Sequence, residues 1–180
     1  MMCLKLKLVI HCWLTMYLIR EAFSLVEFKN IKCESTDKEF CTFDYCHLKS
    51  VNRTYKYFSL RVKLLKVPIT KAKVNGALYQ RLNGYKPFMY NVTVDACKFF
   101  KNQKSNPVAS YFYDFFKGFS NINHSCPFNH DLVLDKLTAE SVNHRLTNIL
   151  PFPKGEYMVN MNWIAYDIIR AVFKIYFILS

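Results

Sequence analysis

A histidine- and cysteine-rich segment, "NINHSCPFNH" at 121–130, holds the side chains that come nearest to a site for chemistry. It contains His124, Cys126 and His130, and Cys97 lies about thirty residues upstream in "VDACKFF". Imidazole and thiolate groups are ligands for zinc, and a Cys–His pair is a nucleophile with its base. In an oxidising compartment the same cysteines form disulfides instead. The compartment therefore decides between these chemistries.

The first two dozen residues resemble a secretory signal. Lys5 and Lys7 give a basic start, an apolar run follows at 8–19, and "AFS" ends with small residues where signal peptidase requires them. A membrane-spanning helix needs about twenty apolar residues, so this run is short for one. We expect residues 1–24 to be a cleaved signal peptide and residues 25–180 to be one secreted, extracellular domain. A retained signal anchor is the alternative.

Three N-x-[ST] motifs agree with secretion, and we predict N-glycans at Asn52, Asn91 and Asn123. Without the signal the chain has 22 basic and 12 acidic residues, a net charge of +10. This surplus favours a cell-surface receptor with an acidic face, or anionic glycans and lipid headgroups, as partners. The secretory signal argues against nucleic acid as a binding partner.

Charged residues interrupt the apolar C-terminal segment 163–180. They are Asp167, Arg170 and Lys174. The segment is also short, so we predict neither a membrane-spanning helix nor a lipid-anchor tail there.

The spacing of the histidines and cysteines argues against a metal and against catalysis. A structural zinc site uses close ligand pairs, and the chain has no C-x-x-C. Cys126 precedes Pro127, which favours a loop held by a bridge over a free thiol. The chain also lacks G-x-S-x-G and H-E-x-x-H motifs. We predict no metal, no cofactor and no enzyme activity; a hydrolase built on a free Cys126 is the least favoured hypothesis.

Disulfide bonds explain the cysteines best. A Cys97–Cys126 bond would close a loop of about thirty residues and contribute ~3 kcal/mol in the chain-entropy model. Cys33 and Cys46 flank a short excursion and are predicted to pair, which leaves Cys41 as an odd thiol. A Cys41–Cys46 bond is an alternative that the sequence leaves open. His124 and His130 are then expected to be solvated loop side chains.

Most of the chain that must position these residues alternates with a period of two, which predicts β-strands. Such strands are expected over 55–65, 69–81, 86–99, 131–137 and 157–179, the last region holding two strands. "LNGY" at 82–85 predicts an Asn-Gly hairpin turn with positive φ at both central residues. Many short strands with hairpin turns favour an antiparallel β-sandwich.

One segment follows a helical period instead. "NPVASYFYDFFKGF" has Asn106 as an N-cap, Pro107 at the first helical position and Gly118 as a stop. Its aromatic residues recur every three or four positions, so we predict one short amphipathic helix inserted in the sandwich. Packing of these aromatics against the sandwich is favoured over a cofactor site.

Ordered along the chain, the motifs "FKNIKCES", "YCHLKSVNRTYKY", "LNGYKPFMYNVTVDACKFF", "FSNINHSCPFNHD" and "LPFPKGEY" resemble those of a large, fly-expanded family of secreted proteins of unknown function. That family is placed near the MD-2-related lipid-recognition (ML) fold and has chemosensory proteins among its relatives. The resemblance covers essentially the whole predicted mature chain. It implies an immunoglobulin-like, ML-like sandwich, and it matches Cys33, Cys46, Cys97 and Cys126 to family cysteines, with Cys41 as an addition. Lipid binding is implied only through the fold neighbourhood.

The inward faces of the predicted strands are apolar and rich in aromatic residues. Two sheets that splay apart would hold an apolar ligand between them, with the helix as a lid. The same side chains would equally well fill a solid core, and the pattern does not separate the two. The predicted lining is Phe58, Leu60, Val62, Leu64, Phe88, Tyr90, Val92, Phe112, Phe115, Phe116, Tyr157, Val159, Met161, Trp163, Phe173 and Ile175.

Two functions follow. The leading hypothesis is a secreted glycoprotein that binds a small apolar ligand, a lipid or hydrocarbon signal, between two sheets. The alternative is an extracellular protein-interaction module with a solid core that acts through its surface. If the strands at 55–65 and 69–81 form a hairpin, Arg61, Lys63, Lys71 and Lys73 make a basic stripe, and protection of an edge strand from aggregation is its favoured use.

Overall fold

The computed structural model describes residues 7, 13, 25–52, 55–149 and 152–180. The predicted signal peptide at 1–24 lies outside these residues, apart from positions 7 and 13.

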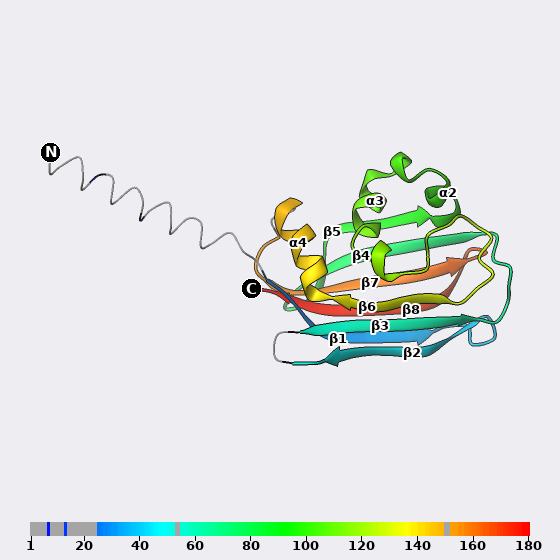
Figure 1. Cartoon of the computed structure of the whole chain (residues 1–180), viewed down its shortest axis with the longest axis horizontal. Helices are drawn as coiled ribbons and strands as arrows, with labels where there is room; N and C mark the ends of the chain where they lie inside the picture. Colours follow the sequence, from blue (N-terminus) through cyan, green and yellow to red (C-terminus); the bar gives the residue numbers. More distant parts are fainter. Residues whose placement is uncertain (1–6, 8–12, 14–24, 53–54, 150–151) are drawn as a thin grey trace.

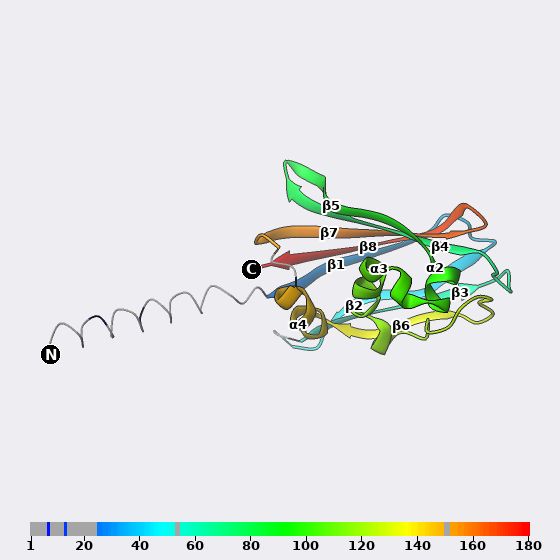
Figure 2. The same cartoon turned by 90° about the horizontal axis from the view of Figure 1, so that it is seen from above.

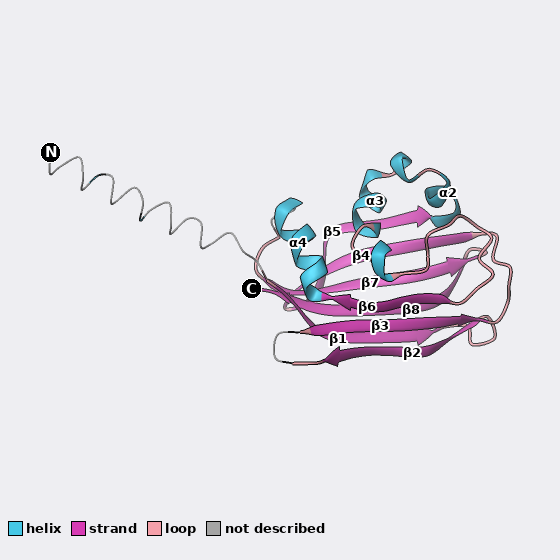
Figure 3. Cartoon of the chain, in the orientation of Figure 1, coloured by secondary structure: helices cyan, strands magenta, loops and turns pink. Residues whose placement is uncertain are grey.

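Two antiparallel sheets face each other (Figures 1 and 3). The larger sheet has the strand order β1 (Val26–Ser35), β8 (Ile168–Leu179), β7 (Gly155–Ala165), β4 (Ala72–Leu82), β5 (Gly84–Asp95). The smaller sheet has the order β2 (Cys41–Ser50), β3 (Lys56–Leu64), β6 (Leu132–Thr138). The predicted mainly β, antiparallel sandwich is confirmed.

The alternation of β3 shows why these segments form a sandwich. Phe58, Leu60 and Val62 are at most 2% exposed and point into the core. Ser59 breaks the alternation, since it is also buried, beside an irregularity in the β3–β6 pairing. Its hydroxyl donates to Asp135 Oδ1 and accepts from the backbone N–H of Lys136, so its burial leaves no polar group unpaired.

The hairpin between β4 and β5 lies where the Asn-Gly motif predicts it, but its geometry differs. Leu82 pairs with Gly84, so Asn83 alone forms the turn, and of the two central residues only Gly84 has positive φ, at 89°. The predicted two-residue turn is therefore wrong. Met89 has a φ of 56° where the register of the pair shifts.

β3 and β4 do not form a hairpin, because they belong to different sheets. The predicted basic stripe is wrong for this reason. Arg61 of the smaller sheet pairs with Asp131, while Lys71 and Lys73 pair with Asp167 near the larger sheet.

The predicted helix begins as expected and ends early. α3 (Pro107–Tyr113) has Asn106 as its N-cap, whose side chain accepts from the N–H of Ala109 at 3.0 Å. It ends at Tyr113, before Gly118, and a 3₁₀ turn, η2 (Lys117–Phe119), follows.

The prediction of a single helix is wrong. α2 (Ala96–Lys101) follows β5 directly, and the carboxylate of Asp95 caps it by accepting from the N–H of Lys98 at 2.9 Å. A 3₁₀ turn, η1 (Gln103–Ser105), joins α2 to α3. α4 (Ala139–Ile149) follows β6, and Thr138 Oγ1 accepts from the N–H of Ser141.

The two long edges of the sandwich differ. On one side β1 and β2 lie next to each other, and the Cys33–Cys46 disulfide joins them. On the other side β5 and β6 are apart, and α2 and α3 lie between them, as the view from above shows (Figure 2). We call the first the closed edge and the second the open edge.

Candidate functional site

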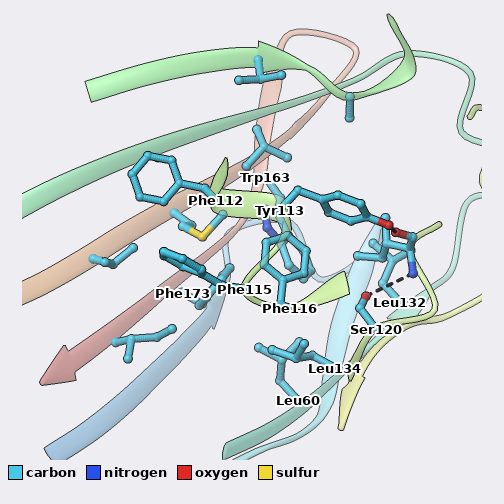
Figure 4. Close-up of a pocket in the computed structure, with 18 of the residues that line it drawn as sticks. Leu60, Phe112, Tyr113, Phe115, Phe116, Ser120, Leu132, Leu134, Trp163 and Phe173 are labelled. Atoms are coloured by element: carbon cyan, nitrogen blue, oxygen red, sulfur yellow. Dashed lines mark hydrogen bonds between the residues drawn. The ribbon is translucent and has the colours of Figure 1, made fainter. Parts of the chain in front are cut away.

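A cavity of about 350 Å³ lies between the two sheets. Its walls are the inner faces of both sheets and the helical segment at the open edge. Figure 4 shows rings of that segment directed into the space bordered by Phe173 and Trp163 on one side and by Leu60 and Leu134 on the other. The sandwich is therefore hollow, whereas the sequence pattern was equally compatible with a solid core.

All the residues predicted to line a ligand site border this cavity except one. The exception is Phe88, which lies farther along β5 and packs against Phe152 and Tyr157, with ring centroids 6.2 and 5.6 Å away. Those two rings fill the space between the sheets at that level, so Phe88 lies behind them.

Two buried tyrosines of the lining have their hydroxyl groups bonded to the protein backbone. Tyr113 Oη donates to the carbonyl of Ile122 at 2.9 Å, and Tyr157 Oη donates to the carbonyl of Pro153 at 2.6 Å. Burial raises the pKa of both phenols, so both stay neutral.

The two charged residues of the lining are paired as well. Lys73 Nζ lies 2.7 Å from Asp167, and the guanidinium of Arg170 is bonded to Asp37. Apart from these paired groups the lining is neutral, so the cavity offers a ligand contact with carbon and no free charge.

The helical segment at the open edge, residues 96–122, forms an aromatic lid. Phe112, Phe115 and Phe116 of the predicted helix line the cavity, and their rings also meet one another or a neighbour edge to face. These aromatic side chains therefore pack against the sandwich, as predicted, and line the cavity at the same time. Such edge-to-face pairs are a favoured geometry of aromatic rings.

Sequence reasoning missed several aromatic residues of the wall. None of them was on a face that the sequence analysis predicted to line the site. They are Phe28, Phe40, Phe99, Phe100, Tyr113, Phe128 and Phe152. For Phe99 and Phe100 the available signal was Asp95, an N-cap residue type that precedes them by four and five positions.

Both ends of the lid are fastened. Cys97 at the start of α2 is bonded to Cys126, so the predicted disulfide is present, and it spans 29 residues of sequence. Past the lid's last turn, Asn121 Oδ1 accepts from the N–H of Val133 at 2.8 Å, and its Nδ2 donates to the carbonyl of Asp131 at 2.7 Å. These bonds attach the end of the lid to β6 and the residue before it.

His124 and His130 are not solvated loop side chains as predicted. Both are half-buried, and their Nε2 atoms lie 2.7 Å apart. The Nδ1 atoms of His124 and His130 lie 2.7 and 2.9 Å from the carbonyls of Ser125 and Asp131. The loop folds back on itself between them, which sequence spacing does not reveal.

The remaining cysteine, Cys41, is free and buried, so the alternative Cys41–Cys46 bond is wrong. Its Sγ lies 3.5 Å from the carbonyl of Arg170. Burial raises the pKa of this thiol, which makes it a poor nucleophile.

The three predicted glycan acceptors, Asn52, Asn91 and Asn123, are exposed. Asn91 lies on the outward face of β5, where its Oδ1 accepts from Asn75 Nδ2 at 2.9 Å.

Within the described part of the chain, no group of three or more His, Cys, Asp or Glu side chains is placed to hold a metal ion. No helix among those residues is long and apolar enough to span a membrane.

Part of the sequence matches a known protein family. Residues 74–159 match the model of a family described as "Protein of unknown function (DUF1091)". This segment belongs to the DUF1091 family. The resemblance to a family of unknown function, predicted from the motifs, is thereby confirmed. The DUF1091 segment runs from β4 into β7, and it includes the whole aromatic lid and the Cys97–Cys126 disulfide.

Among solved structures, the crystal structure of a Niemann-Pick type C2 protein from Japanese carpenter ant is similar to this chain. The TM-score is 0.31 and the sequences are 11% identical, over 84% of this chain and 90% of the other. No curated protein matches the sequence.

Proposed function

We propose that this protein is a secreted glycoprotein that binds a small apolar ligand, a lipid or hydrocarbon, between its two sheets and carries out no catalysis on it. The observation that supports this function is the cavity of about 350 Å³ with its apolar wall. Small-molecule sites are typically ~300–1,000 Å³ and mainly apolar. The alternative interaction module required a solid core, and the cavity argues against one.

The wall also indicates how such a ligand would be held. Because the phenols of Tyr113 and Tyr157 and the charges of the lining are already paired within the protein, binding would come mainly from removal of hydrocarbon from water. This transfer is worth about 0.8 kcal/mol for each methylene. Longer members of a homologous series should therefore bind more tightly until the cavity is full.

The covalent features support an extracellular location. Two disulfides are typical of proteins that fold in oxidising compartments. The exposed positions of Asn52, Asn91 and Asn123 leave room for glycans.

A fluorescence titration tests this function. Trp163 lines the cavity, and Trp13, the other tryptophan of the chain, lies in the predicted signal peptide. Titration of the folded protein with primary alcohols of increasing length should change Trp163 emission saturably, with affinity that rises with chain length.

Two matched variants give the titration its control. Val159→Phe adds a ring inside the cavity and should weaken binding by about tenfold or more, equivalent to ~1.4 kcal/mol. Val172→Phe, on the neighbouring strand β8, lies outside the lining and should leave affinity unchanged. No saturable signal in the wild-type protein, or equal loss in both variants, would count against a ligand in the cavity.

A further inference from the structure

The place where the cavity reaches solvent can be located from the exposure of its lining. Of the lining residues, only Val108 of α3 is exposed, at 41%. The nearest part of the larger sheet contributes Tyr90 and Val92 of its edge strand β5, both half-buried. The exposed part of the lining therefore lies at the open edge, on α3 and beside β5.

Buried apolar side chains border the cavity at the two ends of the sandwich. At one end Val142 and Leu146 of α4, together with Phe152, are at most 9% exposed and border the cavity. At the other end Ile69 and Phe128 form a backbone bridge and are buried to a similar degree. Among the described residues, the cavity is therefore bordered at both ends by buried side chains.

The contact between β5 and α3 is made by side chains. Tyr90 of β5 and Phe112 of α3 meet edge to face, with ring centroids 5.7 Å apart and an interplanar angle of 78°. Over the described residues, no backbone hydrogen bond joins α3 to either sheet. The remainder of the lid is fastened at Cys97 and Asn121.

We propose that ligands enter and leave the cavity between β5 and α3, and that Tyr90 and Phe112 are the gate. The proposal rests on the proposed function, since it concerns access to the same cavity. Separation of the two rings by a shift of α3 opens a path past Val108, while the flanks of the lid stay attached. The gate sets how fast a ligand enters and leaves, while the inner wall of the cavity supplies most of the binding affinity.

Stopped-flow exchange of the apolar fluorescent probe N-phenyl-1-naphthylamine tests this gate. Tyr90→Ala and Phe112→Ala should each raise the association and dissociation rate constants by about fivefold, the factor that matches one lost edge-to-face contact. Because both side chains also border the cavity, their loss should weaken binding as well, so the association rate constant is the readout specific to the gate. Val108→Phe adds a ring at the mouth and should lower both rate constants.

Conservative and matched variants separate gating from misfolding. Tyr90→Phe and Phe112→Leu keep a bulky apolar side chain and should restore rates toward the wild type. Tyr85→Ala removes another tyrosine from β5 that faces Tyr176, outside the cavity, and should leave both rate constants unchanged.

Three results decide the matter. A higher association rate constant in Tyr90→Ala and Phe112→Ala, with a lower one in Val108→Phe, supports the gate. Wild-type binding with unchanged rates in Tyr90→Ala, Phe112→Ala and Val108→Phe overturns the gate alone. Absence of probe binding to the wild-type protein overturns the proposed function and the gate with it.

Discussion

The closed and open edges of the sandwich are each secured by one disulfide, but the two bonds do different work. Cys33–Cys46 joins β1 of one sheet directly to β2 of the other, with Cα atoms 6.3 Å apart. Cys97–Cys126 joins the start of the lid to the loop that precedes β6 and leaves β5 and β6 apart. The sheets therefore meet along one edge and diverge toward the other.

The packing follows the same division. Near the closed edge, Phe28 and Phe58 of opposite sheets meet with centroids 5.1 Å apart, and both are at most 4% exposed. At the open edge, Phe115 and Phe116 are half-buried and border the cavity. All four rings border the same cavity, so the two regions differ in how fully their rings are buried.

Core truncations should show the largest difference between the two regions. Phe58→Ala should lower the free energy of unfolding by about 3–5 kcal/mol, because the ring is only 1% exposed and its contacts are lost in full. Phe115→Ala should cost much less, about 1–2 kcal/mol, because its ring is only half-buried. Urea unfolding of both variants measures this difference, and equal losses would contradict the contrast.

Removal of either disulfide should have the second-largest effect on the free energy of unfolding. Replacement of both cysteines by serine should cost about 3–4 kcal/mol for Cys97–Cys126, and slightly less for Cys33–Cys46, whose sequence separation is 13 against 29. Only the first pair should also release the lid and abolish probe binding. Loss of binding in the Cys33–Cys46 variant alone would reverse the roles given to the two edges.

The thiol of Cys41 should report smaller movements of the closed edge. Its pKa is raised by burial, so the thiol contributes stability below its ordinary pKa of about 8.5 and loses it as pH rises through the raised value. Iodoacetamide at mildly alkaline pH should leave Cys41 unmodified in the folded protein and alkylate it in denaturant. Rapid alkylation of the folded chain would show that this edge opens.

Exposed ion pairs should matter least to either edge. Lys71 and Lys73 lower the pKa of Asp167 to about 2, so the carboxylate is charged at all ordinary pH values, and its contribution is lost as pH falls toward 2. Because the group is exposed and screened by salt, Asp167→Asn should leave the midpoint of urea unfolding nearly unchanged at neutral pH. NMR titration of the Asp167 carboxyl checks the lowered pKa, and a marked loss of stability in the variant would contradict the small effect.

The sequence predicted much of the scaffold, because strand alternation and capping are local signals. Phe58, Leu60 and Val62 show their period directly, and Asn106 with Pro107 marks the start of α3. α2 was missed because Asp95 continues the alternation of β5 while it also caps the helix. Local patterns are weakest where one residue serves two elements.

The cavity is a different matter. Inward residues such as Val159 and Phe173 have the same period whether the sheets are close together or splayed, so alternation alone carries no information on the distance between them. The contact of His124 with His130 likewise depends on how a whole loop folds back.

Native mass spectrometry of the protein secreted from insect cells tests the central claim most directly. We predict a species that carries one apolar molecule per chain, which solvent extraction removes and an added apolar probe replaces. A ligand-free mass that takes up no probe at saturating concentration, from a protein with both disulfides intact, would contradict it.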